Sequence, residues 1–419
     1  MTAAIRITYR IETAGSIERL ADKIASDQST GTFVDLPGET EELKNRVAAR
    51  VESIRNLPDI ATPSFPTDER GPFHRADVDI AFPLNAVGTD LSALMTIAIG
   101  GVYSIKGMSG IRIVDMQLPD AFRGVYPGPQ FGMKGSRKLT SVYDRPIIGT
   151  IIKPALGLRP HESAVLVGEV VEAGADFIKD DEKLMSPDYS PLEDRVKAIM
   201  PIILDHEQKS GRKCMYAWGI SATDPDVMMR NHDLVLKAGG NCAVININSI
   251  GMGAMLFLRK RSGLVLHAHR NGWDILTRHP GLGMDFKVYQ QFWRMLGVDQ
   301  FQINGIGVKY WEPDDSFIES FKAVSKPLFI DDDCPLPVAG SGQWGGQAPE
   351  TYKRTGNTVD LMYLCGGGIV SHPGGAAAGV KAVTQAWEAA VQGVPLYIYA
   401  KDHPELAQSI AKFADGKAT

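Results

Sequence analysis

The sequence predicts an α/β protein in which a C-terminal (β/α)8 TIM barrel follows an N-terminal α+β domain of the ferredoxin-like type. Two observations carry this prediction. From Pro146 onward, short β-rich runs alternate with helix-length segments, whereas residues 1–140 combine half-buried strands and amphipathic helices in a different order. With 419 residues, 44% of them hydrophobic, the chain is long enough to form one large or two unequal domains.

The barrel is predicted from eight β-rich runs, at 147–152, 175–179, 213–218, 242–247, 264–268, 300–304, 336–340 and 360–365. The helices expected between them include 161–173, 190–209, 225–238, 285–296, 314–324 and 374–392. Near-continuous apolar runs separated by helices indicate parallel strands buried on both faces, and eight such units close a barrel. A doubly wound open sheet is the alternative, because strand boundaries are uncertain in a single sequence.

The N-terminal part is expected to hold strands at 5–11, 75–83 and 110–117 and helices at 16–28 and 40–54. A stretch rich in Pro, Gly and Arg, 121–146, is expected to connect it to the barrel. We therefore predict an N-terminal domain over 1–140 and a catalytic barrel over 141–419, which ends in a helical extension from Pro404 to Phe413.

Composition narrows the class of protein. The formal charge of −5 and the pI near 6.0 give no basic face for nucleic acid or an anionic membrane. Residues 1–7 lack the basic start and apolar core of a signal peptide, and no apolar run reaches membrane-spanning length, so we expect a cytoplasmic protein. Four widely spaced cysteines, Cys214, Cys242, Cys334 and Cys365, suggest buried, reduced thiols.

Polar or glycine-rich segments follow five of the predicted strands, where a barrel of this kind collects its reactive groups. They are Lys153-Pro154, Lys179-Asp180-Asp181-Glu182, His267-Ala268-His269-Arg270, Gln302-Ile303-Asn304 and Gly366-Gly367-Gly368. Each has a structural alternative. The acids are suited to cap the following helix, a histidine at a strand end often serves the core or rim, and glycines turn the chain tightly.

As a set, these segments favour a metal site with anion sites around it. Asp181 and Glu182 offer the hard oxygen ligands that Mg²⁺ prefers. Lys179 is open to three roles: a counter-ion, a proton carrier, or a third oxygen ligand if its amine takes up CO₂ as a carbamate. The glycine triplet suits a phosphate, and Arg270 suits a second anionic group. Such a site fits chemistry through a metal-stabilised enediolate.

The chain resembles the RuBisCO large-subunit superfamily over nearly its whole length. The likeness lies in the order and spacing of Gly149 to Leu158, Phe177 to Glu182, His267 to Arg270 and Gly366 to Pro373, and in Ser29 to Phe33 near the start. The resemblance implies that Lys179 is carbamylated by CO₂ and binds Mg²⁺ with Asp181 and Glu182.

The resemblance also implies roles around the metal. Lys153 would handle the enediolate proton, and Gly366, Gly367 and Gly368 would bind a phosphate. His269 and Arg270 would lie at the other end of the substrate, with His269 among the catalytic residues. Thr32 would come from the partner subunit, because sites of this family form between the two chains of a dimer, so we expect a homodimer with shared active sites.

Several departures from the family pattern bear on CO₂ fixation. Ala155 stands where carboxylases carry a second lysine, and Gly101 stands where they carry an asparagine. Asn304, predicted to contact substrate, replaces a usual histidine, and the segment up to Lys309 is shorter than the family's mobile lysine loop. Whether Lys309 acts in catalysis stays open. Ser341 only approximates the family's phosphate and hydroxyl contact.

We therefore expect a RuBisCO-like protein that does not fix CO₂. With the metal and enolate residues retained, the favoured activity is decarboxylation, or other C–C cleavage, of a phosphorylated keto sugar acid. Its substrate is expected to carry one phosphate and a carboxylate facing Arg270. The alternatives are an enolase or isomerase of a sugar phosphate, as in methionine salvage, and a non-catalytic binding protein.

Overall fold

The computed structural model describes residues 3–32, 34 and 36–414, which divide into two compact units. The first unit contains the chain up to Tyr126 together with Gly272–Phe292, and the second contains Pro127–Asn271 and the chain from Trp293 onward. The predicted boundary between residues 140 and 141 stays a prediction.

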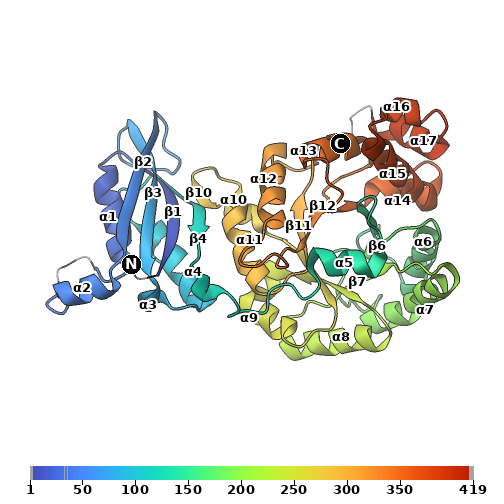
Figure 1. Cartoon of the computed structure of the whole chain (residues 1–419), viewed down its shortest axis with the longest axis horizontal. Helices are drawn as coiled ribbons and strands as arrows, with labels where there is room; N and C mark the ends of the chain where they lie inside the picture. The colour runs from blue at the N-terminus through green and yellow to red at the C-terminus, as the bar shows by residue number, and fades with distance from the viewer. Residues whose placement is uncertain (1–2, 33, 35, 415–419) are drawn as a thin grey trace. The chain divides into compact units, whose positions relative to one another are not determined.

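The second unit is a closed, parallel eight-stranded barrel (Figure 1), so the predicted TIM barrel is confirmed and the open sheet is excluded. Its strands are β5 (Ile147–Ile151), β6 (Phe177–Lys179), β7 (Met215–Gly219), β8 (Cys242–Asn246), β9 (Val265–His269), β11 (Gln300–Asn304), β12 (Leu336–Ala339) and β13 (Met362–Cys365). β13 pairs with β5 and thereby closes the ring. All eight strands lie within two residues of the predicted runs.

Helices alternate with these strands, as the sequence pattern predicts. They are α5 (Gly132–Thr140), α6 (Pro160–Glu172), α7 (Leu192–Ser210), α8 (Pro225–Lys237), α9 (Ile247–Arg259), α12 (Asp314–Ser325), α13 (Ala348–Arg354), α14 (Gly367–Val370), α15 (Gly375–Gln392), α16 (Leu396–Tyr399) and α17 (Pro404–Phe413). Local chemistry sets their ends. Asp224 caps the start of α8 by accepting from the Asp226 N–H, and α7 ends at Gly211 in the left-handed conformation.

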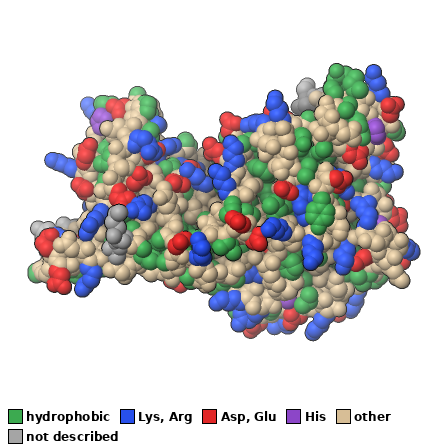
Figure 2. Space-filling model, in the orientation of Figure 1, with side chains coloured by type: hydrophobic (Ala, Val, Ile, Leu, Met, Phe, Trp, Pro, Cys, Tyr) green, Lys and Arg blue, Asp and Glu red, His purple; other side chains and the backbone are tan. Residues whose placement is uncertain are grey.

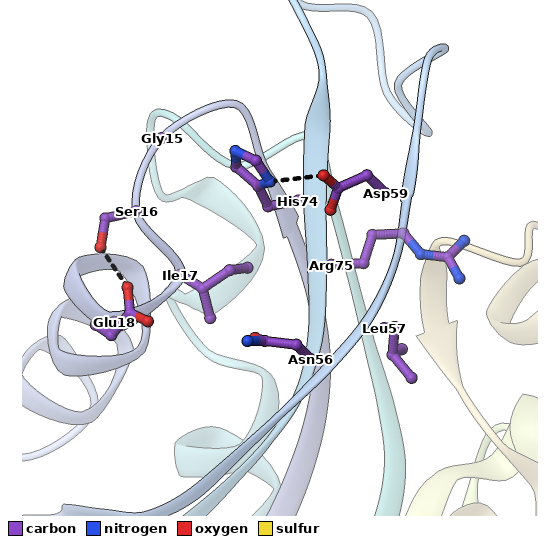
Figure 3. A pocket seen from close by; sticks show the side chains of 9 residues that line it. All are labelled: Gly15, Ser16, Ile17, Glu18, Asn56, Leu57, Asp59, His74 and Arg75. Carbon is purple, nitrogen blue, oxygen red and sulfur yellow. Dashed lines mark hydrogen bonds and ion pairs between the residues drawn. The ribbon is translucent and has the colours of Figure 1, made fainter.

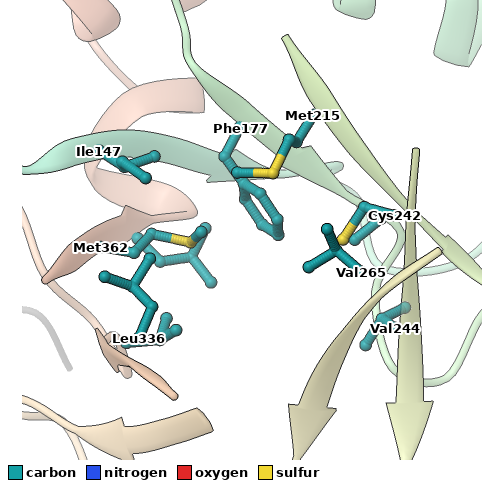
Figure 4. Close-up of a cluster of buried hydrophobic side chains, with 11 residues drawn as sticks. Ile147, Phe177, Met215, Cys242, Val244, Val265, Leu336 and Met362 are labelled. Atoms are coloured by element: carbon teal, nitrogen blue, oxygen red, sulfur yellow. The ribbon is translucent and has the colours of Figure 1, made fainter. Parts of the chain in front are cut away.

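Inward-facing strand side chains fill the barrel (Figure 4). The buried cluster consists of Ile147, Phe177, Met215, Ala217, Cys242, Val244, Val265, Leu336, Val338, Met362 and Leu364. Phe131 and Met133 pack against it, and the N–H groups of Phe131 and Gly132 donate to Asp299, just before β11. Because α5 thus lies at the amino ends of the strands, the carboxyl ends are left for the site. All four cysteines are free and buried, as expected.

The first unit is an α+β fold around one five-stranded sheet with the order β10-β4-β1-β3-β2. Its elements are β1 (Ala4–Thr13), α1 (Ile17–Asp27), α2 (Glu41–Val47), β2 (Arg50–Ile60), β3 (Phe73–Pro83), α3 (Leu84–Val87), α4 (Leu91–Ile99), β4 (Gly110–Gln117), α10 (Trp273–Thr277) and β10 (Leu282–Met284). α11 (Phe286–Met295) begins in this unit. β1 lies antiparallel between β3 and β4, which is the split βαβ arrangement of ferredoxin-like domains.

One sequence prediction in this unit is wrong. The helix expected over 40–54 ends at Val47, and from Arg50 the chain forms the edge strand β2. Both faces of this strand are largely exposed, so it lacks the alternation of apolar and polar residues that marks a half-buried strand. Its charged side chains pair across the sheet instead, as Glu52 does with Arg6.

On the face shown in Figure 2, basic and acidic side chains are interspersed over both units. Within the described part of the chain, no helix has the length and apolar character needed to cross a bilayer.

Truncating a core leucine should destabilise the barrel. Leu364 is fully buried in the interior cluster, so Leu364→Ala should lower the free energy of unfolding by about 2 to 5 kcal/mol through lost burial and an unfilled cavity. Leu204→Ala is the control, because this side chain is 44% exposed. Denaturant unfolding measures both, and equal losses would contradict the packing described for the interior.

Candidate active site

The acidic segment after β6 divides into one structural and two site-facing carboxylates. Asp180 is fully buried, and its Oδ1 accepts a hydrogen bond from the Tyr216 hydroxyl at 2.7 Å. Its Oδ2 accepts from the Gly219 N–H at 3.0 Å and from Arg195 at 3.2 Å. The acids do not cap the following helix, since α7 begins only at Leu192 after the N-cap residue Pro191.

Lys179 is the buried cation of the site, and only 1% of its side chain is exposed. Its Nζ donates to the backbone carbonyl of Asp180 at 2.8 Å and to Glu182 Oε2 at 3.3 Å. Burial lowers its pKa, and the charges of Glu182 and Asp181 oppose that shift only in part. Lys179 therefore loses its proton more readily here than it would in water.

Two further lysines contact Asp181. Lys153 Nζ, from the segment after β5, lies 2.5 Å from Asp181 Oδ2, and Lys183 Nζ lies 3.0 Å from Oδ1. Burial alone would raise the pKa of Asp181, but the hydrogen bonds from Lys153 and Lys183 lower it overall. Asp181 is thus held as a carboxylate between two cations.

Glu182 contacts Lys179 and the imidazole of His269 at the end of β9. His269 Nε2 lies 3.6 Å from Glu182 Oε2. Burial raises the pKa of Glu182, but Lys179 and His269 outweigh it and lower the pKa overall. Burial, with Lys179 nearby, lowers the pKa of His269 to about 4, so its imidazole is neutral near pH 7. Its Nδ1 is buried and has no hydrogen-bond partner among the described residues, which leaves it available to a ligand.

The glycine triplet lies beside Lys153. A Cβ placed on Gly366 would be 3.3 Å from Lys153 Cε, which locates the triplet next to the lysine. At Gly368 a Cβ would lie 2.4 Å from the carbonyl oxygen of Gln343, so this position excludes a side chain. A Cβ on Gly367 meets nothing within 4 Å. The open backbone at Gly367 is compatible with a bound group.

Arg270 and Asn304 meet at a carboxylate that the sequence analysis did not single out. Glu312 Oε2 lies 2.5 Å from Arg270 Nη2 and 2.8 Å from Asn304 Nδ2. Glu312 belongs to the loop between β11 and α12, eight residues after Asn304. Nothing in the residue types of that loop marked it as a partner of Arg270, since the contact depends on the loop's conformation.

The other predicted site residues, Lys309, Ser341 and Thr32, belong to other segments of the chain. The Lys309 N–H donates to the carbonyl of Ser341 at 3.3 Å, which joins the loops after β11 and β12. Thr32 is exposed and belongs to the first unit, as does Gly101, and Phe33 of the same motif lies outside the described residues. The predicted roles of Thr32, Ser341 and Lys309 stay predictions.

The donor set fits a divalent cation only if Lys179 is modified. Among the described residues, no group of three or more His, Cys, Asp or Glu side chains is placed to hold a metal ion. Asp181 and Glu182 supply two carboxylates, and the buried amine of Lys179 adjoins them. A carbamate there would replace a positive charge with a third oxygen ligand, which suits the preference of Mg²⁺ for oxygen.

A hollow of about 350 Å³ lies in the first unit, beside the start of α1 (Figure 3). It is lined by Gly15, Ser16, Ile17, Glu18, Asn56, Leu57, Asp59, His74 and Arg75. Two of its lining side chains contact each other, since His74 Nδ1 lies 3.1 Å from Asp59 Oδ2. None of the predicted site residues lines this hollow.

The fold and the strand-end residues agree with comparisons to known proteins. Residues 132–413 match the catalytic domain, and residues 3–122 the N-terminal domain, of the ribulose bisphosphate carboxylase large chain. The chain therefore belongs to the RuBisCO large-chain family and is a RuBisCO-like protein, as the sequence motifs predicted.

Individual relatives refine this assignment. A protein of Rhizobium rhizogenes named 3-oxo-isoapionate-4-phosphate decarboxylase is 78% identical over 416 residues, 99% of each chain. A 3-oxo-isoapionate-4-phosphate transcarboxylase/hydrolase of Xanthobacter autotrophicus is 42% identical over 98% of this chain and 99% of its own. The crystal structure of a rubisco-like protein from Burkholderia fungorum superposes with a TM-score of 0.91 at 39% identity, over 98% of this chain and 100% of the other.

Adjacent acids in the segment after β6 should respond differently to mutation. Asp180→Ala should lower the free energy of unfolding by about 3 to 5 kcal/mol, because it leaves Arg195 buried without its carboxylate. Asp181→Ala should cost less, because Lys153 and Lys183 retain access to water. Denaturant unfolding compares the two, and a larger loss for Asp181→Ala would contradict the structural role of Asp180.

Acid should destabilise the protein partly through His267, which lies inside the barrel at the level of Phe177. Burial, helped by the charge of Lys179, lowers its pKa to about 3, against 6.5 in the unfolded chain. The unfolded chain binds this proton below pH 6.5 and the folded chain does not. The histidine therefore costs about 1.4 kcal/mol of stability per pH unit from 6.5 toward 3.

His267→Gln should make the loss of stability between pH 6.5 and 5 shallower by that amount. Denaturant unfolding at several pH values measures the slope. The control His161→Gln removes an exposed histidine and should keep the wild-type slope. An unchanged slope in His267→Gln would contradict the neutral, buried state of this imidazole.

Proposed function

We propose that this protein is a metal-dependent decarboxylase whose substrate is 3-oxo-isoapionate 4-phosphate. The observation that carries the proposal is Lys153, which lies 2.5 Å from Asp181 beside Glu182 and the buried amine of Lys179. The substrate is taken from the name of the relative that is 78% identical over 99% of both chains. The decarboxylase expected from the sequence agrees with that name.

A 3-oxo acid loses CO₂ when the electron pair of its C1–C2 bond moves toward the ketone. The product of that step is an enolate, which becomes the final ketone once C2 gains a proton. No oxidant or further reactant is needed. The site must therefore stabilise negative charge on the ketone oxygen and then deliver one proton.

The residues at the carboxyl ends of the barrel strands meet these two requirements. Mg²⁺, held by Asp181, Glu182 and a carbamate on Lys179, would supply positive charge beside the ketone oxygen. Lys153 would donate the proton to C2, because its ammonium lies at the site, 2.5 Å from the proposed metal ligand Asp181. His269 contributes a neutral imidazole whose Nδ1 is available for a hydrogen bond to substrate.

The surroundings of Lys179 support the proposal that it is carbamylated. Only the neutral amine reacts with CO₂, and burial lowers the pKa of this lysine toward that form. The product carries one negative charge where the ammonium carried a positive one. We propose that the glycine triplet receives the substrate phosphate and that the enzyme works in the cytoplasm as a homodimer, with Thr32 contributed by the partner chain.

Purified protein with Mg²⁺ and bicarbonate should release one CO₂ per 3-oxo-isoapionate 4-phosphate consumed. Chelation by EDTA should abolish the release, and Mg²⁺ should restore it. Lys179→Ala and Lys153→Met should lower kcat at least about a hundredfold, since each removes a group acting at the reacting atoms. Lys197 is exposed and pairs with Glu193, so Lys197→Met is the matched control and should keep wild-type activity.

Other outcomes separate the alternatives. Solvent proton exchange into substrate without loss of carbon would support an enolase or isomerase and overturn the decarboxylase. Recovery of the lost carboxylate in a stable acid would support the transcarboxylase/hydrolase activity named for the relative with 42% identity. Carbamylation has its own readout, a carbamate resonance in ¹³C NMR with ¹³CO₂ that disappears in Lys179→Ala.

A further inference from the structure

Glu312 places a buried carboxylate at the end of the site where Arg270 was expected to bind an anion. Its Oε2 accepts from Arg270 Nη2 at 2.5 Å. Only 3% of the Glu312 side chain and 10% of the Arg270 side chain are exposed. The guanidinium therefore has a full counter-charge within the same chain.

Two further hydrogen bonds hold this carboxylate in place. Asn304 Nδ2 donates to Glu312 Oε2 at 2.8 Å, and the Ser316 hydroxyl donates to Oε1 at 2.6 Å. Asn304 adopts φ 92°, in the left-handed region that asparagine tolerates better than most residues. The strand end and the first turn of α12 thus both orient Glu312, so the pair is a fixed feature of the fold.

The pair changes what this end of the site can accept. A phosphate dianion brought to Arg270 would also meet the negative charge of Glu312, in surroundings that screen charge poorly. The attraction of the phosphate to Arg270 and its repulsion from Glu312 then largely cancel. An uncharged hydroxyl has no such penalty, because it can donate to the carboxylate or accept from the amide of Asn304.

We propose that Glu312 is a specificity-determining residue that neutralises Arg270, so that this end of the site takes an uncharged, hydroxyl-bearing group and rejects a second phosphate. The inference deepens the proposed function and rests on it, since it defines the substrate class as keto sugar acids with a single phosphate. It assigns to Arg270 a neutral group instead of the carboxylate expected from the sequence.

The test compares the binding of ribulose 1,5-bisphosphate with that of ribulose 5-phosphate, by calorimetry with Mg²⁺ and bicarbonate present. Wild-type protein should bind the bisphosphate no more tightly than the monophosphate. Glu312→Gln keeps the shape of the side chain but removes its charge. It should raise the affinity for the bisphosphate at least about tenfold relative to the monophosphate.

Glu319→Gln is the matched control, because it makes the same substitution at an exposed side chain of α12; its affinity ratio should equal that of the wild type. A folded Glu312→Gln protein with the wild-type ratio would overturn the inference. If that variant does not fold, the wild type alone decides, since at least tenfold tighter binding of the bisphosphate would overturn it. Binding is measured without turnover, so a failure to release CO₂ refutes the proposed function independently.

Discussion

The buried carboxylate of Asp180 is the constraint on which the rest of the site depends. Its hydrogen bonds with Tyr216, Gly219 and Arg195 fix the chain where β6 leaves the barrel. With Asp180 turned into the protein, Lys179 and Glu182 meet on the other side of the segment. The buried Asp180 thereby fixes the positions of the charged side chains that follow it in the chain.

The balance of positive and negative charge in the candidate site follows from the position of Asp180. Three lysines, Lys153, Lys179 and Lys183, contact the carboxylates of Asp181 and Glu182. Only Lys179 is fully buried, so it alone carries the full cost of desolvation. The proposed conversion of its ammonium to a carbamate would remove that buried cation and would give the site the negative charge that a divalent ion requires. The same burial that disfavours the charged lysine thus favours the proposed metal site.

The sequence predicted most of the barrel because its strands are buried on both faces and therefore read as short apolar runs. It failed at β2, whose exposed edge position leaves no such pattern. Lys153, Asp181 and His269, which the strand-end motifs singled out, follow or end their strands in the structure, and their roles stay predictions. The motifs did not separate Asp180 from Asp181, since only the packing against Arg195 does so. Glu312 was missed because its partners depend on the conformation of a loop, and no pattern in the sequence indicates that conformation.

The departures from the carboxylase pattern form a consistent set once Glu312 is included. Fixing CO₂ and releasing it share an enolate, and the outcome depends on whether a proton or CO₂ reaches its carbon. Lys153 is the proposed proton donor, whereas Ala155 stands where the resemblance to carboxylases led us to expect a second lysine. At the far end, Asn304 donates to Glu312. The amide of Asn304 orients the Glu312 carboxylate toward Arg270, and in the proposal above that carboxylate makes this end of the site neutral, so Asn304 and Glu312 act there as one unit.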